Sequence, residues 1–172
     1  MSGEGMNMKR VIVIGCPGSG KSTFARALAE QTGLPLRYLD MMYWNPDRTT
    51  VPKEVFRERL AAALREDAWI IDGNYASTME LRLAACDTVF FLDYPLETCI
   101  EGVRQRKGKA RPDMPWVEYG EDAEFISFIE RYRTESRPQV MELLSRYPEK
   151  NVVIFRSREE GNAFLLALLT EK

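Results

Sequence analysis

The sequence predicts an α/β fold in which one parallel, five-stranded sheet is covered by helices on both faces. Short apolar runs rich in β-branched residues alternate with longer stretches of helical periodicity along all 172 residues. The first apolar run leads through a glycine-rich loop directly into a helix, as in parallel sheets. In such folds, ligands bind at the edge where the strands end.

Five apolar runs are the predicted strands, and several end in an acidic residue. They cover residues 9–14, 36–39, 68–71, 88–92 and 151–155. Asp40, Asp72 and Asp93 follow the second, third and fourth runs at once. Because parallel strands end at one edge of the sheet, we expect these carboxylates near the glycine-rich loop.

The helices between the strands are marked by local start and stop signals. Proline begins, divides or closely follows a helix, glycine ends one, and a serine with a glutamate three residues later caps one. The signals are Gly33 with Pro35 (end), Pro52 (start), Ser77 with Glu80 (cap), Pro95 (start), Pro138 (kink or division) and Ser157 with Glu160 (cap).

The domain organisation and composition are those of a single soluble domain. Residues 1–8 form a polar lead, expected to be disordered or a tag remnant, and 9–172 form one domain. With a net charge of −2 the chain lacks the excess of positive charge that favours strong direct nucleic-acid binding, so we expect none. We expect no membrane span and no signal peptide. Three cysteines without metal-ligand spacing and the lack of histidine indicate a reduced, cytoplasmic protein without imidazole chemistry.

Residues 15–22 (GCPGSGKS) match the phosphate-binding pattern G-x-x-x-x-G-K-[ST]. Its glycines let the backbone approach a polyphosphate, and its N–H groups with the next helix's N-terminus attract negative charge. Lys21 would reach the β- and γ-phosphates, and the Ser22 hydroxyl would complete the shell of Mg²⁺. The sequence therefore predicts a nucleotide site.

The residues around the acidic strand ends favour transfer to a bound molecule over hydrolysis. Gly73 follows Asp72 and Tyr94 follows Asp93, so neither strand end carries the Asp-Glu pair common in hydrolytic motors. The guanine-specific N-K-x-D motif, the D-x-x-G switch and the L-S-G-G-Q signature are also absent. Water is therefore a poor candidate for the phosphoryl acceptor.

Three further segments resemble nucleoside monophosphate kinases. They are residues 71–75 (IDGNY), 100–106 and 132–138. The narrower resemblance is to the bacterial DNA topology modulation proteins of the adenylate-kinase-like superfamily. Its matching stretches are 39–44, 69–75, Arg82 with Asp87, 91–93 and Arg137 with Pro138. Gly102 differs, because it stands where those kinases often carry the first arginine of the lid helix.

The resemblance implies a three-layer P-loop NTPase fold with strand order 2-3-1-4-5, an acceptor-side segment at about 40–66 and a helical lid insertion at about 104–118. It also implies ATP, Mg²⁺ and phosphoryl transfer to a small molecule. Asp40 is similar to the strand-2 aspartate with which shikimate- and gluconate-kinase relatives bind an acceptor hydroxyl.

These considerations assign candidate roles to individual residues. The catalytic candidates are Lys21, Asp40, Asp72 and Arg106. The nucleotide candidates are Gly15, Pro17, Gly18, Ser19, Gly20, Lys21, Ser22, Thr23, Arg106, Arg111 and Arg137. The Mg²⁺ candidates are Ser22 and Asp72. The acceptor candidates are Asp40, Trp44, Asn74, Tyr75 and Arg82.

Each role has a structural alternative. Asp72 and Asp40 could cap a strand end or turn, Arg82 could pair with Asp87, and the lid arginines could form a solvated basic face. The aromatic candidates could be ordinary packing. For the whole protein, the alternatives are an ATP-binding regulator of DNA topology and a slow NTPase. We expect a monomer or a homodimer.

Overall fold

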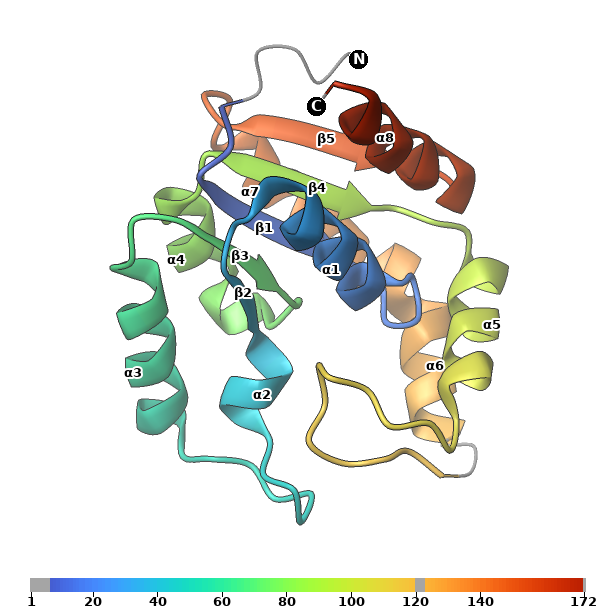
Figure 1. Ribbon diagram of the computed structural model, residues 1–172. Helices are drawn as coiled ribbons and strands as arrows, with labels where there is room; N and C mark the ends of the chain where they lie inside the picture. Colours follow the sequence, from blue (N-terminus) through green and yellow to red (C-terminus); the bar gives the residue numbers. More distant parts are fainter. Residues whose placement is uncertain (1–6, 120–122, 172) are drawn as a thin grey trace.

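The computed structural model describes residues 7–119 and 123–171 and contains one all-parallel sheet of five strands (Figure 1). The strands are β1 (Arg10–Gly15), β2 (Leu36–Tyr38), β3 (Trp69–Asp72), β4 (Thr88–Leu92) and β5 (Asn151–Phe155). Their order is β2-β3-β1-β4-β5. The predicted fold class and strand order are confirmed, except that the predicted lid is helical only as far as Arg106, and residues 107–119 form a loop. Residues 1–6 of the predicted lead lie outside the described residues, whereas Met8 packs against the core.

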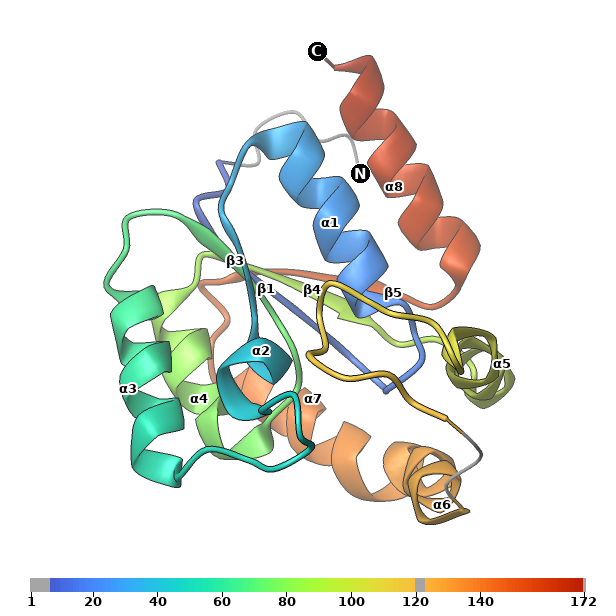
Figure 2. The ribbon, with the colours of Figure 1, turned by 60° about the horizontal axis from the view of Figure 1, so that its bottom comes forward.

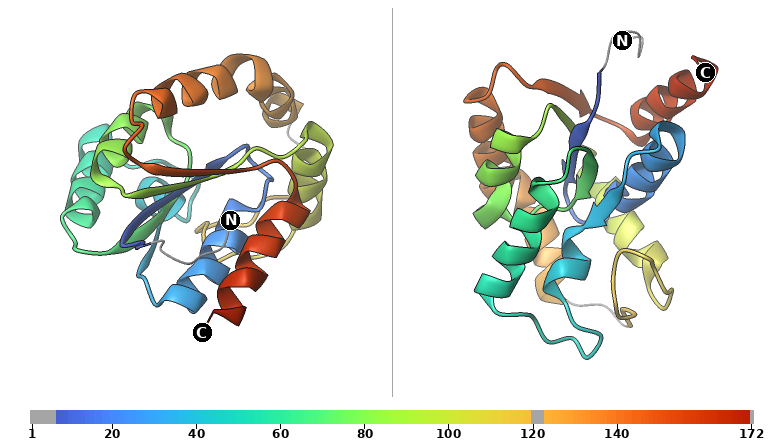
Figure 3. Two further views of the ribbon diagram at one scale, coloured as in Figure 1. Left: turned by 90° about the horizontal axis from the view of Figure 1, so that it is seen from above. Right: turned by 60° about the vertical axis from the view of Figure 1, so that its left-hand side comes forward.

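Helices cover both faces of the sheet (Figure 3). They are α1 (Lys21–Thr32), α2 (Leu39–Tyr43), α3 (Lys53–Leu64), α4 (Ala76–Ala85), α5 (Leu96–Arg106), α6 (Ala123–Arg131), the π-helical turn η1 (Tyr132–Ser136), α7 (Arg137–Ser145) and α8 (Arg158–Thr170). One face carries α1 and α8, and the other carries α3, α4 and α7. None of the helices within the described ranges has the length and apolarity needed to cross a membrane.

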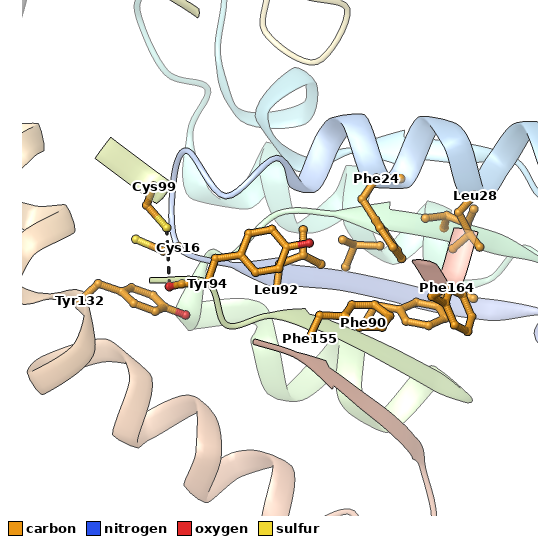
Figure 4. Close-up of a cluster of buried hydrophobic side chains, with 14 of the residues drawn as sticks. Cys16, Phe24, Leu28, Phe90, Leu92, Tyr94, Cys99, Tyr132, Phe155 and Phe164 are labelled. Carbon is orange, nitrogen blue, oxygen red and sulfur yellow. Dashed lines mark hydrogen bonds between the residues drawn. The ribbon is translucent and has the colours of Figure 1, made fainter. Parts of the chain in front are cut away.

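The side chains of the central strand β1 point alternately to the two faces of the sheet, and the core has one apolar cluster on each face. Val11 and Val13 of β1 contribute to the cluster beneath α1 and α8, whereas Ile12 and Ile14 contribute to the opposite cluster. Because both faces of the strand are buried, every one of these positions is apolar. Figure 4 shows the first cluster, in which four phenylalanine rings pack together (Phe24, Phe90, Phe155 and Phe164).

Two predicted element boundaries are wrong. Strand β2 ends at Tyr38, and Asp40 lies in the first turn of α2 rather than at a strand end. Leu39 begins α2 and is fully buried, so packing of this side chain favours the helix. The capping box at Ser77 is also absent, because α4 begins at Ala76 and already includes Ser77.

Pro138 divides the long helical segment, as predicted. It lies at the start of α7, where its missing N–H group removes no hydrogen bond of that helix. The wider turn η1 precedes it, and the Arg137 N–H donates to the Tyr132 carbonyl five residues earlier. The turn η1 therefore joins α6 directly to α7.

Helix α5 packs directly on the backbone of the phosphate-binding loop. A Cβ atom added at Gly102 would lie 2.0 Å from the Gly18 carbonyl oxygen, and one added at Gly18 would lie 2.0 Å from the Cys99 carbonyl oxygen. Figure 4 shows the side chains of Cys16 and Cys99 close together at this contact. Gly102 is therefore a contact position, which explains why an arginine is not found there.

We expect Gly102→Ala to lower the free energy of unfolding by about 1–3 kcal/mol, because the added methyl group overlaps the loop. The same change in an unhindered helix is favourable by propensity. It should also weaken MgATP binding measured by calorimetry. The control is Glu101→Ala at the exposed neighbouring position. Unchanged urea unfolding of Gly102→Ala would show that the contact is not tight.

Candidate functional site

A cleft of about 860 Å³ lies at the carboxyl edge of the sheet. Residues of the phosphate-binding loop, α2 and the lid segment 107–119 line it. Figure 2 shows the lid segment between α2 and α5. Its basic lining residues are Lys21, Arg26, Arg48, Arg104, Arg106, Lys107, Lys109, Arg111 and Arg158. Its acidic ones are Asp40, Asp72, Asp113 and Glu118. The cleft is thus cationic within a chain whose net charge is −2, which favours anionic ligands.

The backbone of the phosphate-binding loop adopts positive φ angles at its glycines. Gly18 and Gly20 have φ angles of +84° and +92°, a region that side chains strongly disfavour. The Ser19 N–H donates to the Cys16 carbonyl at 3.0 Å, which closes the turn. Lys21 Nζ donates to the same carbonyl at 3.3 Å, so the lysine lies over its own loop.

Asn74, an acceptor candidate, is engaged with the phosphate-binding loop. Its amide oxygen accepts from the Gly15 N–H at 3.1 Å, and its amide nitrogen donates to the Gly15 carbonyl at 2.5 Å. These two bonds join the end of β1 to the turn after β3. The side chain therefore positions the start of the loop, and because Asn74 also lines the cleft, its expected role at the acceptor stays a prediction.

Asp72 is a buried carboxylate beside the first turn of α1. It is 4% exposed, and its Oδ2 accepts a 2.5 Å hydrogen bond from Ser22 Oγ. Burial raises the pKa of Asp72 from 3.8 to about 6, although Lys21 and Ser22 oppose the shift. Its Oδ1 is buried without a hydrogen-bond partner in the described part of the chain. One oxygen is thus left for a cation or its water.

Asp40 and Tyr75 form a pair on the opposite side of the cleft. The Tyr75 hydroxyl donates to Asp40 Oδ1 at 2.5 Å, and both residues line the cleft. Burial raises the pKa of Asp40, while Tyr75 and Lys21 oppose the shift. Tyr75 packs edge-on against Tyr43, with ring centroids 5.2 Å apart. Asp40 therefore reaches the cleft from α2, although it does not end a strand.

The end of α5 and the lid segment each bring one of the three expected arginines to the cleft. Arg106 Nε donates to Glu118 at 3.1 Å, and its guanidinium lies 5.7 Å from the Phe125 ring centroid. Burial lowers the pKa of Arg106. Arg111 lies 3.6 Å from Glu118 and 3.2 Å from Asp113. Glu118 and Asp113 thus form ion pairs with the guanidinium groups that a phosphate could contact.

Arg137, the third expected arginine, is held elsewhere. Its Nε and Nη2 donate to the Asp93 carboxylate at 2.8–3.0 Å. Hydrogen bonding to Asp93 raises the pKa of Arg137. Arg137 is not among the residues that line the cleft, and its expected role in nucleotide binding is corrected to a structural one. Asp93 is structural, as expected.

Arg82 fits neither of its two expected roles. It is fully buried, and its guanidinium donates to the carbonyls of Gly73, Asn74 and Tyr75. Asp87 accepts from the backbone of residues 9 and 10 instead. Arg82 therefore holds the turn after β3 in place from within the core, and it does not line the cleft.

Several cleft residues were missed by the sequence interpretation. Arg26 lies one turn beyond Ser22 on α1, and Arg158 begins α8 with its guanidinium close to Gly20. Arg48 donates to the Val117 carbonyl at 3.0 Å and lies over the Trp116 ring. Two of these positions had usable signals, because Arg158 begins the helix after the last strand and Arg26 follows Ser22 by one helical turn. The place of Arg48 depends on how the lid segment folds back, which no motif encodes.

No protein-family model and no curated protein matches the chain. Solved structures do match it. Shikimate kinase from Bacteroides thetaiotaomicron has 20% sequence identity and a TM-score of 0.56, over 96% of this chain and 99% of that one. Shikimate kinase from Acinetobacter baumannii, in complex with shikimate, has 18% identity and a TM-score of 0.61, over 96% of each chain. At these identities the likeness shows the fold, which is the P-loop kinase fold.

We expect Asp72→Asn to stabilise the ligand-free protein at about pH 7.5 by roughly 1–3 kcal/mol. The pKa of Asp72 is raised to about 6, so ionising this carboxyl opposes folding. The penalty is absent below roughly pH 4 and complete above roughly pH 6. Asparagine keeps an oxygen for the Ser22 hydroxyl.

Urea unfolding at about pH 7.5 and below roughly pH 4 measures the difference in free energy of unfolding between Asp72→Asn and the wild type. This difference should vanish below roughly pH 4. Asp67→Asn, at an exposed position outside the cleft lining, is the control for lost surface charge. If Asp72→Asn were less stable than the wild type at about pH 7.5, the charge of Asp72 would be stabilising, contrary to our interpretation.

Proposed function

We propose that this protein is a kinase that transfers the γ-phosphoryl group of MgATP to a hydroxyl group of a small molecule. The observation that carries the proposal is the grouping of Lys21, Ser22 and the buried Asp72 at the phosphate-binding loop, beneath a lid that supplies arginines. Phosphoryl transfer depends mainly on positioning and on neutralising charge, which this grouping provides.

The donor would be ATP with its phosphates in the loop. Lys21 and the loop amides would bind the β- and γ-phosphates, and Arg106 and Arg111 would exchange Glu118 and Asp113 for phosphate oxygens. Ser22 Oγ and the unpartnered oxygen of Asp72 suit Mg²⁺, which prefers oxygen ligands. When bound, Mg²⁺ would offset phosphate charge.

The acceptor would bind at Asp40 and Tyr75, across the cleft from the loop. A carboxylate whose pKa is raised by burial is suited to accept the proton that the attacking hydroxyl loses. Trp44 and Trp116, whose ring centroids are 5.6 Å apart, would form an apolar wall. The Acinetobacter shikimate kinase, whose structure holds shikimate, supports a hydroxylated acceptor.

The narrower resemblance, to DNA topology modulation proteins, stays a prediction. A direct action on DNA would need a basic face, and the cationic residues found here line a cleft of about 860 Å³ at the phosphate-binding loop. Salt-dependent binding of duplex DNA by the Lys21→Ala variant would favour a regulator whose DNA contacts lie outside this cleft.

The test is an ADP-release screen with MgATP and a panel of hydroxylated metabolites, nucleosides and nucleotides. We expect Lys21→Ala to reduce kcat/KM by roughly 100-fold or more, because charge neutralisation at the transferred group is lost. Lys53→Ala, at an exposed position outside the cleft, is the matched control. ATP turnover that no acceptor stimulates would contradict a kinase and indicate a slow NTPase.

A further inference from the structure

Asp113 is a buried lid carboxylate to which the proposed function has assigned no ligand contact. It is 2% exposed and lines the cleft, within the loop that Figure 2 shows between α5 and α2. Its Oδ1 is buried and receives no hydrogen bond from any described residue. A carboxylate oxygen left in this state costs about 1–3 kcal/mol or more. The atom therefore points to a donor that a ligand would bring.

Two arginines form ion pairs with Asp113 but leave its Oδ1 without a hydrogen bond among the described residues. Arg111 Nη1 lies 3.2 Å from Oδ2, and Arg26 Nη1 lies 3.6 Å from Oδ1, which is beyond hydrogen-bonding distance. Arg26 Nη1 and Arg111 Nη2 are themselves buried without a hydrogen-bond partner among the described residues. These three charged atoms lie in ion pairs but lack hydrogen bonds, which a ligand in the cleft could supply.

Asp113 faces the acceptor side of the cleft. The pKa values of Asp40 and Asp72 are raised first by burial, and the charge of Asp113 adds to both shifts, which places it within electrostatic reach of both groups. The adjoining lid residue Trp116 packs edge-on against Trp44 of the acceptor side. The segment that holds Asp113 therefore contacts the side of the cleft on which Trp44 and Asp40 lie.

We propose that Asp113 is a second acceptor-binding carboxylate, which together with Asp40 selects an acceptor bearing at least two hydroxyl groups. The inference rests on the proposed function and names the acceptor class for the same site. Each carboxylate would accept one hydroxyl group, so a compound with a single hydroxyl leaves one of the two carboxylates without a hydrogen bond from the acceptor. An amine would satisfy the same oxygens, but the excess of basic residues in the cleft disfavours a cation.

The test compares Asp113→Asn with the wild type on hydroxylated acceptors and their monodeoxy counterparts. The panel contains shikimate, D-gluconate, myo-inositol, ribose and adenosine. The wild type should prefer a polyhydroxylated acceptor to its monodeoxy counterpart. Asp113→Asn should raise the acceptor KM and reduce that preference roughly tenfold, with the ATP KM within about twofold of the wild type. Glu118→Gln, which removes another lid carboxylate beside Arg111, should keep the preference.

Every outcome bears on the assignment. If Asp113→Asn raised the ATP KM and left the preference unchanged, Asp113 would act only by positioning Arg111, and the inference would be overturned. Turnover of monohydroxylated compounds alone, or of no panel member while MgATP still binds by calorimetry, would also overturn it and leave the nucleotide site standing. Absence of MgATP binding would contradict the proposed function itself. Thermal unfolding checks that each variant is folded.

Discussion

The rest of the site depends on one buried carboxylate, Asp72, held next to the phosphate-binding loop. The parallel register pairs it with Val13 of β1, so the strand pairing itself brings it to the loop. Burial opposes its ionisation, and Ser22 and Lys21 only partly offset this. A protein retains such a group where a bound cation or proton makes it useful. Hydrogen bonds made by Arg82 and Asn74 hold the backbone around Asp72 in place.

The side chains that hold the site in place have their hydrogen-bond partners, whereas some of the atoms beside the cleft do not. Arg82 donates to three carbonyls of the turn after β3, and Asn74 bonds both backbone groups of Gly15. By contrast, Asp72 Oδ1 and Asp113 Oδ1 are buried beside the cleft without hydrogen-bond partners among the described residues. Because buried polar groups are usually paired, unpaired atoms gathered at one cleft indicate where ligand groups belong.

The strands, most helices and the phosphate-binding loop could be predicted because their signals are local. Residues 15–22 identify the loop, and the apolar periodicity fixes the order of elements. The strand order came from a resemblance, since sequence pattern alone does not give it. Arg137 and Arg82 were misassigned because only tertiary packing shows that one bonds Asp93 and the other is enclosed. Asp113 carried no signal, because its place depends on the fold of the lid.

The central claim, that Asp72 and Ser22 complete a Mg²⁺-nucleotide site at the loop, is tested most directly by calorimetric titration with a non-hydrolysable ATP analogue, in Mg²⁺ and in EDTA. The wild type should bind at least roughly tenfold more tightly with Mg²⁺, since the metal joins the carboxylate to the phosphates. Asp72→Asn should lose most of this difference. Equal affinities of the wild type with Mg²⁺ and with EDTA would contradict the account.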